Sequence, residues 1–194
     1  MRRYLSVRVL LAASVVVVGV VALARDSRDF RIRDDCDPAT FNAAFGDGIC
    51  ATNFDGETTV DEFLVELTEE GSVGHWRFNP DRVTLERREQ TSFESRGGEF
   101  HTFTRVDEFG GGIIAGLNDL SGAGDVRPEC GIIEEGDPDG IGELAAPSAT
   151  NVFVDAGAEL PGPRAGSNAL PVGTTKWQCC IHPWMRTTAD LRTN

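Results

Sequence analysis

Three side chains that bind soft metal ions lie close together near the C-terminal end of the sequence. Residues 177–185 have the sequence WQCCIHPWM and contain Cys179, His182 and Met185. A thiolate, an imidazole and a thioether together suit copper, because sulfur ligands stabilise Cu(I) while imidazole also accommodates Cu(II). A trigonal copper site has two histidines and one cysteine with a weak axial methionine, so this segment predicts a second histidine from elsewhere in the chain.

The second histidine is predicted to be His101. The chain contains three histidines, of which His182 is already assigned. His101 follows two glycines and begins an alternating segment, so its side chain is predicted to point inward at the start of a strand. His75 lies outside such a segment, and we prefer a surface or hydrogen-bonded role for it.

Two adjacent cysteines compete for the metal, and the period of the strand favours Cys179. In the predicted strand TTKWQC, Trp177 is the obvious inward residue. Side chains alternate between the two faces of a strand, so Thr175 and Cys179 share the face of Trp177. Cys180 then faces away from the metal.

The other four cysteines are predicted to form two disulfides. Four cysteines allow three pairings. We predict that Cys36 pairs with Cys50, because the two are near each other in the sequence, and that Cys130 pairs with Cys180. The second bond would connect a glycine-rich segment to the metal-binding loop. The alternative is that Cys180 remains a free buried thiol.

The elements predicted to position these side chains are short strands separated by turns. Six strand segments begin at residues 76, 82, 91, 100, 151 and 174; they are WRF, RVTLE, TSFES, FHTFTRV, NVFVDAG and TTKWQC. The 22 glycines and 9 prolines, with many Val, Thr and Phe, favour strands and turns over a helical bundle. The pattern predicts an all-β protein, an antiparallel sandwich.

One short helix and one long insertion interrupt the strand pattern. Thr59 and Glu62 have the spacing of a capping box, and apolar residues then recur at helical spacing. We predict a helix over about 60–69 that covers an edge or an end of the sheet. Residues 107–150 are rich in glycine and are predicted to form a long irregular loop insertion, of the kind that is often functional.

The sequence resembles the cupredoxins, the blue-copper electron-transfer family that includes plastocyanin. The resemblance is carried by the GGEFHTF segment at 97–103, the LPVGT turn at 170–174 and above all by the Cys-x-x-His-Pro-Trp-Met ending. It implies a Greek-key β-sandwich over 76–194, with 36–75 as an N-terminal extension that contains the short helix.

The same resemblance implies the cofactor and the activity. One type 1 copper ion per chain would be held by His101, Cys179, His182 and Met185. The protein would transfer single electrons to or from a redox partner protein and would not be an enzyme. Met185 and the apolar surroundings, including Trp184, would tune the reduction potential.

The first 24 residues are typical of a secretion signal. Basic residues precede an apolar run of 16 residues that ends in Ala-Leu-Ala, a small-x-small cleavage site. The run is shorter than the roughly 20 residues that span a bilayer, so cleavage is favoured over a retained anchor. We predict a signal peptide or N-terminal membrane anchor over 1–24, a charged linker over 25–35 and an extracytoplasmic location, where disulfides form.

The charge of the chain restricts its partners. Three of the 18 basic residues lie in the first 24, which leaves 15 basic against 31 acidic residues and a net charge of −16 for the rest. So acidic a protein repels phosphate backbones, which argues against nucleic acid as a partner. A redox partner with a basic docking surface would be steered toward it, and a membrane is expected only if the N-terminal segment is retained. Solubility alone is the other explanation of this charge.

Three other functions are compatible with parts of the sequence. An exported protein that handles copper without electron transfer is the main alternative. An enzyme with copper or zinc is disfavoured, because four ligands leave no open position for a substrate and no Ser-His-Asp or paired-carboxylate signature is present. The third alternative is a structural role for a β-sandwich that binds no metal.

Overall fold

The computed structural model describes residues 28–134, 136 and 140–193, so the predicted signal peptide lies outside the described part. Within that part, no helix is long and apolar enough to cross a membrane. The elements, in chain order, are β1 (Arg28–Arg33), α1 (Pro38–Phe45), α2 (Val60–Glu70), β2 (Arg77–Asn79), β3 (Arg82–Leu85), β4 (Thr91–Ser95), β5 (His101–Val106), α3 (Ala115–Ser121), β6 (Gly131–Ile132), β7 (Glu143–Leu144), β8 (Asn151–Val154), β9 (Glu159–Pro161), β10 (Gly173–Gln178) and β11 (Arg186–Leu191).

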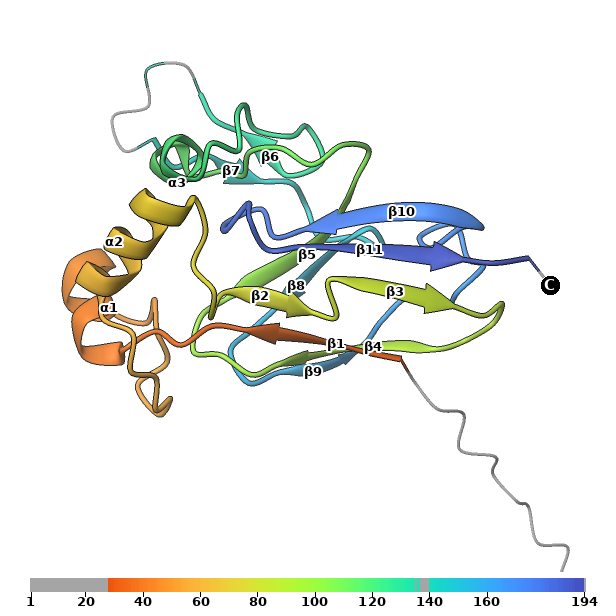
Figure 1. Cartoon of the computed structure of the whole chain (residues 1–194), viewed down its shortest axis with the longest axis horizontal. Helices are drawn as coiled ribbons and strands as arrows, with labels where there is room; N and C mark the ends of the chain where they lie inside the picture. Colours follow the sequence, from red (N-terminus) through yellow and green to blue (C-terminus); the bar gives the residue numbers. More distant parts are fainter. Residues whose placement is uncertain (1–27, 135, 137–139, 194) are drawn as a thin grey trace, which may run out of the picture.

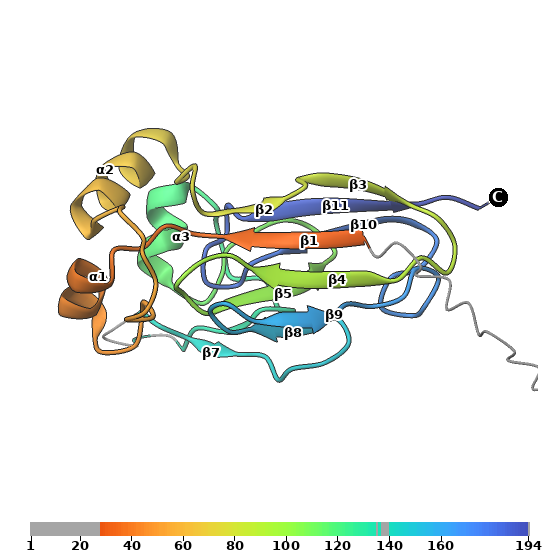
Figure 2. The ribbon, with the colours of Figure 1, turned by 90° about the horizontal axis from the view of Figure 1, so that it is seen from below.

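Two β-sheets form the body of the molecule, with all three helices gathered at one end (Figures 1 and 2). One sheet has the strand order β2-β1-β4-β9 and the other the order β3-β11-β10-β5-β8. Aromatic rings fill the space between them. The centre of the Phe103 ring in β5 lies 5.1 Å from that of Phe30 in β1 and 4.5 Å from that of Phe93 in β4. The centre of the Trp177 ring in β10 lies 4.9 Å from it. The predicted β-sandwich is confirmed, and so are all six predicted strands. The sheets are mixed rather than purely antiparallel, because β1 runs parallel to β4 and β3 runs parallel to β11.

The prediction of a charged linker is wrong for residues 28–33, which form β1. The strand pairs with β2 on one side and runs parallel to β4 on the other. Phe30 and Ile32 point into the core, whereas Arg28 and Arg31 stay exposed and pair with glutamates of neighbouring segments. The apolar residues at alternate positions are the strand signal, which the density of charges around them concealed.

The N-terminal extension contains two helices where one was predicted. The capping box at Thr59 and Glu62 is present, and it starts α2 as expected. The missed helix, α1, begins with Asp37 as its N-cap and a proline in its first turn, both common at helix starts. The predicted Cys36–Cys50 disulfide is confirmed and encloses α1.

The insertion at 107–150 is more regular than predicted, because it contains α3 and the short hairpin of β6 and β7. The N-cap of α3, Ile114, makes no side-chain hydrogen bond, so this helix has no capping signal in the sequence. The insertion is fixed to the end of β10 by the Cys130–Cys180 disulfide and by the hydrogen bond from Ile113 N to Cys180 O, 2.7 Å. Both disulfide predictions are therefore confirmed.

Candidate metal centre

The end of β10 directs two adjacent cysteines to opposite faces of the sheet. Trp177 Nε1 donates to Thr175 Oγ1, so these side chains share a face, and Cys179 continues it into the main core. Cys180 belongs instead to a small second cluster with Cys130 and Ile113. The predicted strand register is confirmed, and Cys179 is the one free cysteine in the described part of the chain.

A tight loop after Cys179 brings His182 and Met185 back toward it. Cys179 N donates to Met185 O at 3.0 Å, and Met185 N donates to His182 O at 2.9 Å. The loop thus closes on itself before β11 begins and pairs with β10. Cys179 and Met185 are fully buried, and His182 is 4% exposed.

The other histidine comes from β5, which is paired with β10. His101 begins β5 and is fully buried. Its Nδ1 atom lies 3.8 Å from Cys179 Sγ, and His182 Nδ1 lies 3.9 Å from the same sulfur. The three donor atoms of His101, Cys179 and His182 all lie within 4.8 Å of one another.

These separations fit two ligands of one metal ion. With bonds of about 2.0 Å to nitrogen and about 2.3 Å to sulfur, an angle near 120° places the two donor atoms about 3.7 Å apart. The structure therefore brings together three of the four predicted ligands by their donor atoms, and it buries Met185 at the end of the same loop. Two imidazoles and one thiol are the trigonal set that suits copper.

The remaining histidine, His75, lies away from the site, next to Asp35. Its side chain is 64% exposed, and its Nδ1 atom is 3.2 Å from Asp35 Oδ2. This is the surface, paired role that the sequence analysis preferred for it.

The electrostatics of the pocket favour a thiolate. Burial lowers the pKa of His101, but hydrogen bonds to Asp34 and Cys179 outweigh burial and raise that pKa from 6.5 to about 10. Burial also raises the pKa of the Cys179 thiol, but His101 and His182 outweigh it and hold that pKa well below the usual 9.0. The thiolate is the form of cysteine that binds metals.

Each histidine has a buried carboxyl group on the side away from the shared sulfur. Asp34 Oδ2 lies 2.7 Å from His101 Nε2, and Glu99 Oε2 lies 3.6 Å from His182 Nε2. Burial raises the pKa of Glu99. Burial also raises the pKa of Asp34, but the hydrogen bond and charge interaction with His101 and the backbone hydrogen bonds from Gly98 and Glu99 together lower it. Neither carboxyl group was predicted, because Asp34 fell in the predicted linker and Glu99 lay between the glycines at 97–98 and the predicted strand.

Thr102 is a further residue that the sequence analysis missed. Its hydroxyl accepts a hydrogen bond of 2.8 Å from Cys180 N, 78 residues away along the chain. Because Thr102 follows His101 and Cys180 follows Cys179, this bond fixes the two ligand-bearing segments against each other. No sequence signal distinguished this threonine from others in the strands.

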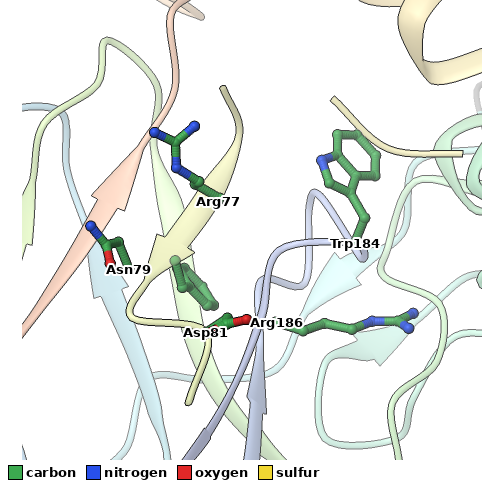
Figure 3. Close-up of a pocket in the computed structure, with 6 residues that line it drawn as sticks. Arg77, Asn79, Asp81, Trp184 and Arg186 are labelled. Carbon is green, nitrogen blue, oxygen red and sulfur yellow. The ribbon is translucent and has the colours of Figure 1, made fainter. Parts of the chain in front are cut away.

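Aromatic rings of α2 and the metal-binding loop cover His182. The ring of Trp184 lies 5.5 Å from that of His182, and Phe63 of α2 lies 6.5 Å from it. The helix predicted to cover an edge or an end of the sheet is thus α2, which lies over the end that carries His182. Trp184 also lines a hollow together with Arg77 and Arg186 (Figure 3).

No protein-family model and no curated protein matches the sequence. Several solved structures are similar to the chain. A purple cupredoxin from Nitrosopumilus maritimus has 10% identity and a TM-score of 0.39, over 86% of this chain and 100% of that one. A dithionite-reduced auracyanin from Roseiflexus castenholzii has 16% identity and a TM-score of 0.33, over 60% and 88%. An amicyanin from Paracoccus versutus has 11% identity and a TM-score of 0.30, over 62% and 77%.

Proposed function

We propose that the chain is an exported one-electron carrier that binds one copper ion through His101, Cys179, His182 and Met185. The observation that carries this proposal is the convergence of two imidazole Nδ1 atoms on one buried cysteine sulfur, at 3.8 and 3.9 Å. A copper ion held by these donors would exchange single electrons by cycling between Cu(II) and Cu(I).

The role of the protein is to keep the same ligand positions in both oxidation states. His101 is held by β5 and Cys179 by the neighbouring β10, while the loop that carries the other two ligands is closed by its own backbone hydrogen bonds. Close packing resists ligand movement, because any shift of a fully buried side chain displaces its neighbours. A site that changes little between oxidation states supports electron transfer.

Copper handling without electron transfer is the alternative function, and the burial of the site argues against it. A carrier that passes its metal on needs donor atoms that an incoming ligand can reach. His182 is the most exposed of the four proposed ligands, and only 4% of its surface is accessible. The same burial leaves a substrate little access to the site, which supports an electron carrier rather than an enzyme. Copper in the wild-type protein should therefore pass only slowly to a chelator.

The proposed partner is a redox protein with a basic docking surface. The charge of −16 outside the first 24 residues would attract such a protein over a long range and speed its association at low ionic strength. The two disulfides support an extracytoplasmic location for this encounter. Association rates that fall as salt is added would support the electrostatic part of the proposal.

The visible absorption spectrum of the folded protein, recorded after addition of Cu(II), tests the proposed function. We expect an intense thiolate-to-copper charge-transfer band and one copper per chain. Cys179→Ser should abolish the band, whereas the matched variant Cys180→Ser should keep it, because Cys180 faces the other side of the sheet. A wild-type protein without the band, or a band that survives in Cys179→Ser, contradicts the proposal.

A further inference from the structure

The carboxylate of Asp34 is enclosed by hydrogen-bond donors next to the proposed copper site. Its side chain is fully buried. Oδ1 accepts a hydrogen bond of 2.7 Å from Gly98 N, and Oδ2 accepts one of 3.2 Å from Glu99 N. Oδ2 also lies 2.7 Å from His101 Nε2. A carboxylate only accepts hydrogen bonds, so the His101 Nε2 atom carries a proton and donates it to Asp34.

This hydrogen bond determines which nitrogen of His101 is available to a metal. With Nε2 protonated and engaged, the lone pair for coordination is on Nδ1, and that atom faces Cys179 Sγ at 3.8 Å. A histidine that binds a metal commonly donates its other N–H to a carboxylate or carbonyl, which fixes the ring and makes it a stronger electron donor.

The two glycines before His101, Gly97 and Gly98, leave space for the Asp34 side chain and the neighbouring disulfide. A Cβ atom at Gly97 would lie 1.8 Å from Asp34 Oδ2, so only glycine leaves room for the carboxylate. A Cβ atom at Gly98 would lie 2.7 and 2.8 Å from the sulfur atoms of Cys36 and Cys50. The two glycines therefore let the end of β1 and the disulfide approach the backbone that leads into the ligand.

Asp34, Glu99 and His101 also form a group of possible ligands whose donor atoms lie within 4.8 Å of one another. Both oxygens of Asp34, however, already accept hydrogen bonds from the protein. The group therefore fits a carboxylate that positions a histidine better than a second metal site.

We propose that Asp34 is a positioning residue of the copper centre, which fixes Nε2–H of His101, presents Nδ1 to the metal and lowers the reduction potential of the bound copper. The negative charge behind the imidazole increases electron donation and favours the more highly charged Cu(II). This inference rests on the proposed function. It makes the N-terminal strand β1, through the residue that follows it, part of the metal site.

The chain offers a matched control one residue away. Asp35 pairs with His75 at 3.2 Å, as Asp34 pairs with His101, but both side chains of the second pair are at least partly exposed. Asp34→Asn and Asp35→Asn remove the same charge from adjacent positions. A difference between them therefore measures the contacts of Asp34 with His101 and the adjoining backbone rather than the loss of one negative charge from the chain.

The test compares the reduction potentials and the copper contents of the full-length wild type, Asp34→Asn and Asp35→Asn. We expect Asp34→Asn to shift the potential upward, and Asp35→Asn to stay near the wild type. Equal potentials in the two variants, with copper retained, overturn the inference. If the wild type shows no thiolate-to-copper band, the proposed function fails instead, so the two failures are distinguishable.

A second measurement does not depend on the folding of any variant. Cu(I) is diamagnetic, so nitrogen-resolved NMR of the Cu(I) wild-type protein reports which ring nitrogen of His101 carries the proton. We expect a slowly exchanging proton on Nε2, because that atom is buried and donates to Asp34. A proton on Nδ1, or coordination through Nε2, overturns the inference.

Discussion

Cys179 and Cys180 are neighbours in the chain, but they serve different structures on opposite faces of one sheet. Cys179 is free and lies between two histidines, whereas Cys180 is bonded to Cys130. The alternation of side chains at the end of β10 produces this division. The proposed metal ligand is therefore fastened, through the next residue, to a disulfide that holds the insertion.

The disulfide should contribute to stability without contributing to metal binding. The double variant Cys130→Ser/Cys180→Ser opens a loop with a sequence separation of 50, which is expected to lower the free energy of unfolding by about 4 kcal/mol. Denaturant unfolding of the copper-free protein measures the loss, and the charge-transfer band of the folded variant should persist. Loss of the band in a variant that still folds would show that Cys180 belongs to the site.

His101 and His75 should differ in their effect on copper content. His101→Ala removes a buried donor that faces Cys179, so we expect the copper and its charge-transfer band to be lost. His75→Ala removes an exposed side chain and should retain one copper per chain. Metal analysis of both purified variants decides the matter, and a coloured site in His101→Ala would disprove the ligand assignment.

Met185→Leu should keep copper and colour while the reduction potential rises. A weak axial thioether stabilises Cu(II), and leucine fills a similar volume without offering a donor. Met185 is fully buried, so the substitution exposes no new surface. Redox titration measures the shift. A lower potential, or loss of the metal, would show that Met185 is not the axial ligand.

In the metal-free protein, the difference in the free energy of unfolding between the wild type and Asp34→Asn should depend on pH and pass through a maximum, because Asp34 and His101 form a pair. Burial raises the pKa of Asp34, but its contacts with His101 and the backbone hydrogen bonds from Gly98 and Glu99 together lower it below 3.8. The contribution of Asp34 to stability is therefore complete above pH 3.8 and is lost as pH falls through the lowered value. Burial lowers the pKa of His101, but its contacts with Asp34 and Cys179 raise it from 6.5 to about 10. The contribution of His101, of which Asp34 supplies a part, is therefore complete below pH 6.5 and is lost as pH rises through about 10.

The difference in the free energy of unfolding should therefore be largest between pH 3.8 and 6.5 and narrow on both sides. Denaturant unfolding at a series of pH values measures it, with Asp35→Asn as the control for the loss of one charge. A difference that does not change with pH would show that Asp34 and His101 do not form an ionised pair in the folded protein.

The sequence by itself determined the features that depend on local spacing. The period of two around Trp177 placed Cys179 and Cys180 on opposite faces, and the capping box at Thr59 located α2, because both signals lie within a few residues of what they specify. The donor types in the 177–185 segment predicted the proposed metal chemistry in the same way.

Only the tertiary structure decided what lies behind the proposed ligands. Asp34 is 67 residues from His101 along the chain, and it reaches the imidazole because β1 pairs with β4, whose end leads into the glycine turn before His101. Pairing between distant strands depends on how the whole core packs, and no local pattern encodes it. The charges around Phe30 and Ile32 resembled those of a linker for the same reason: they are solvent-facing residues of a strand whose partner is far away in the sequence.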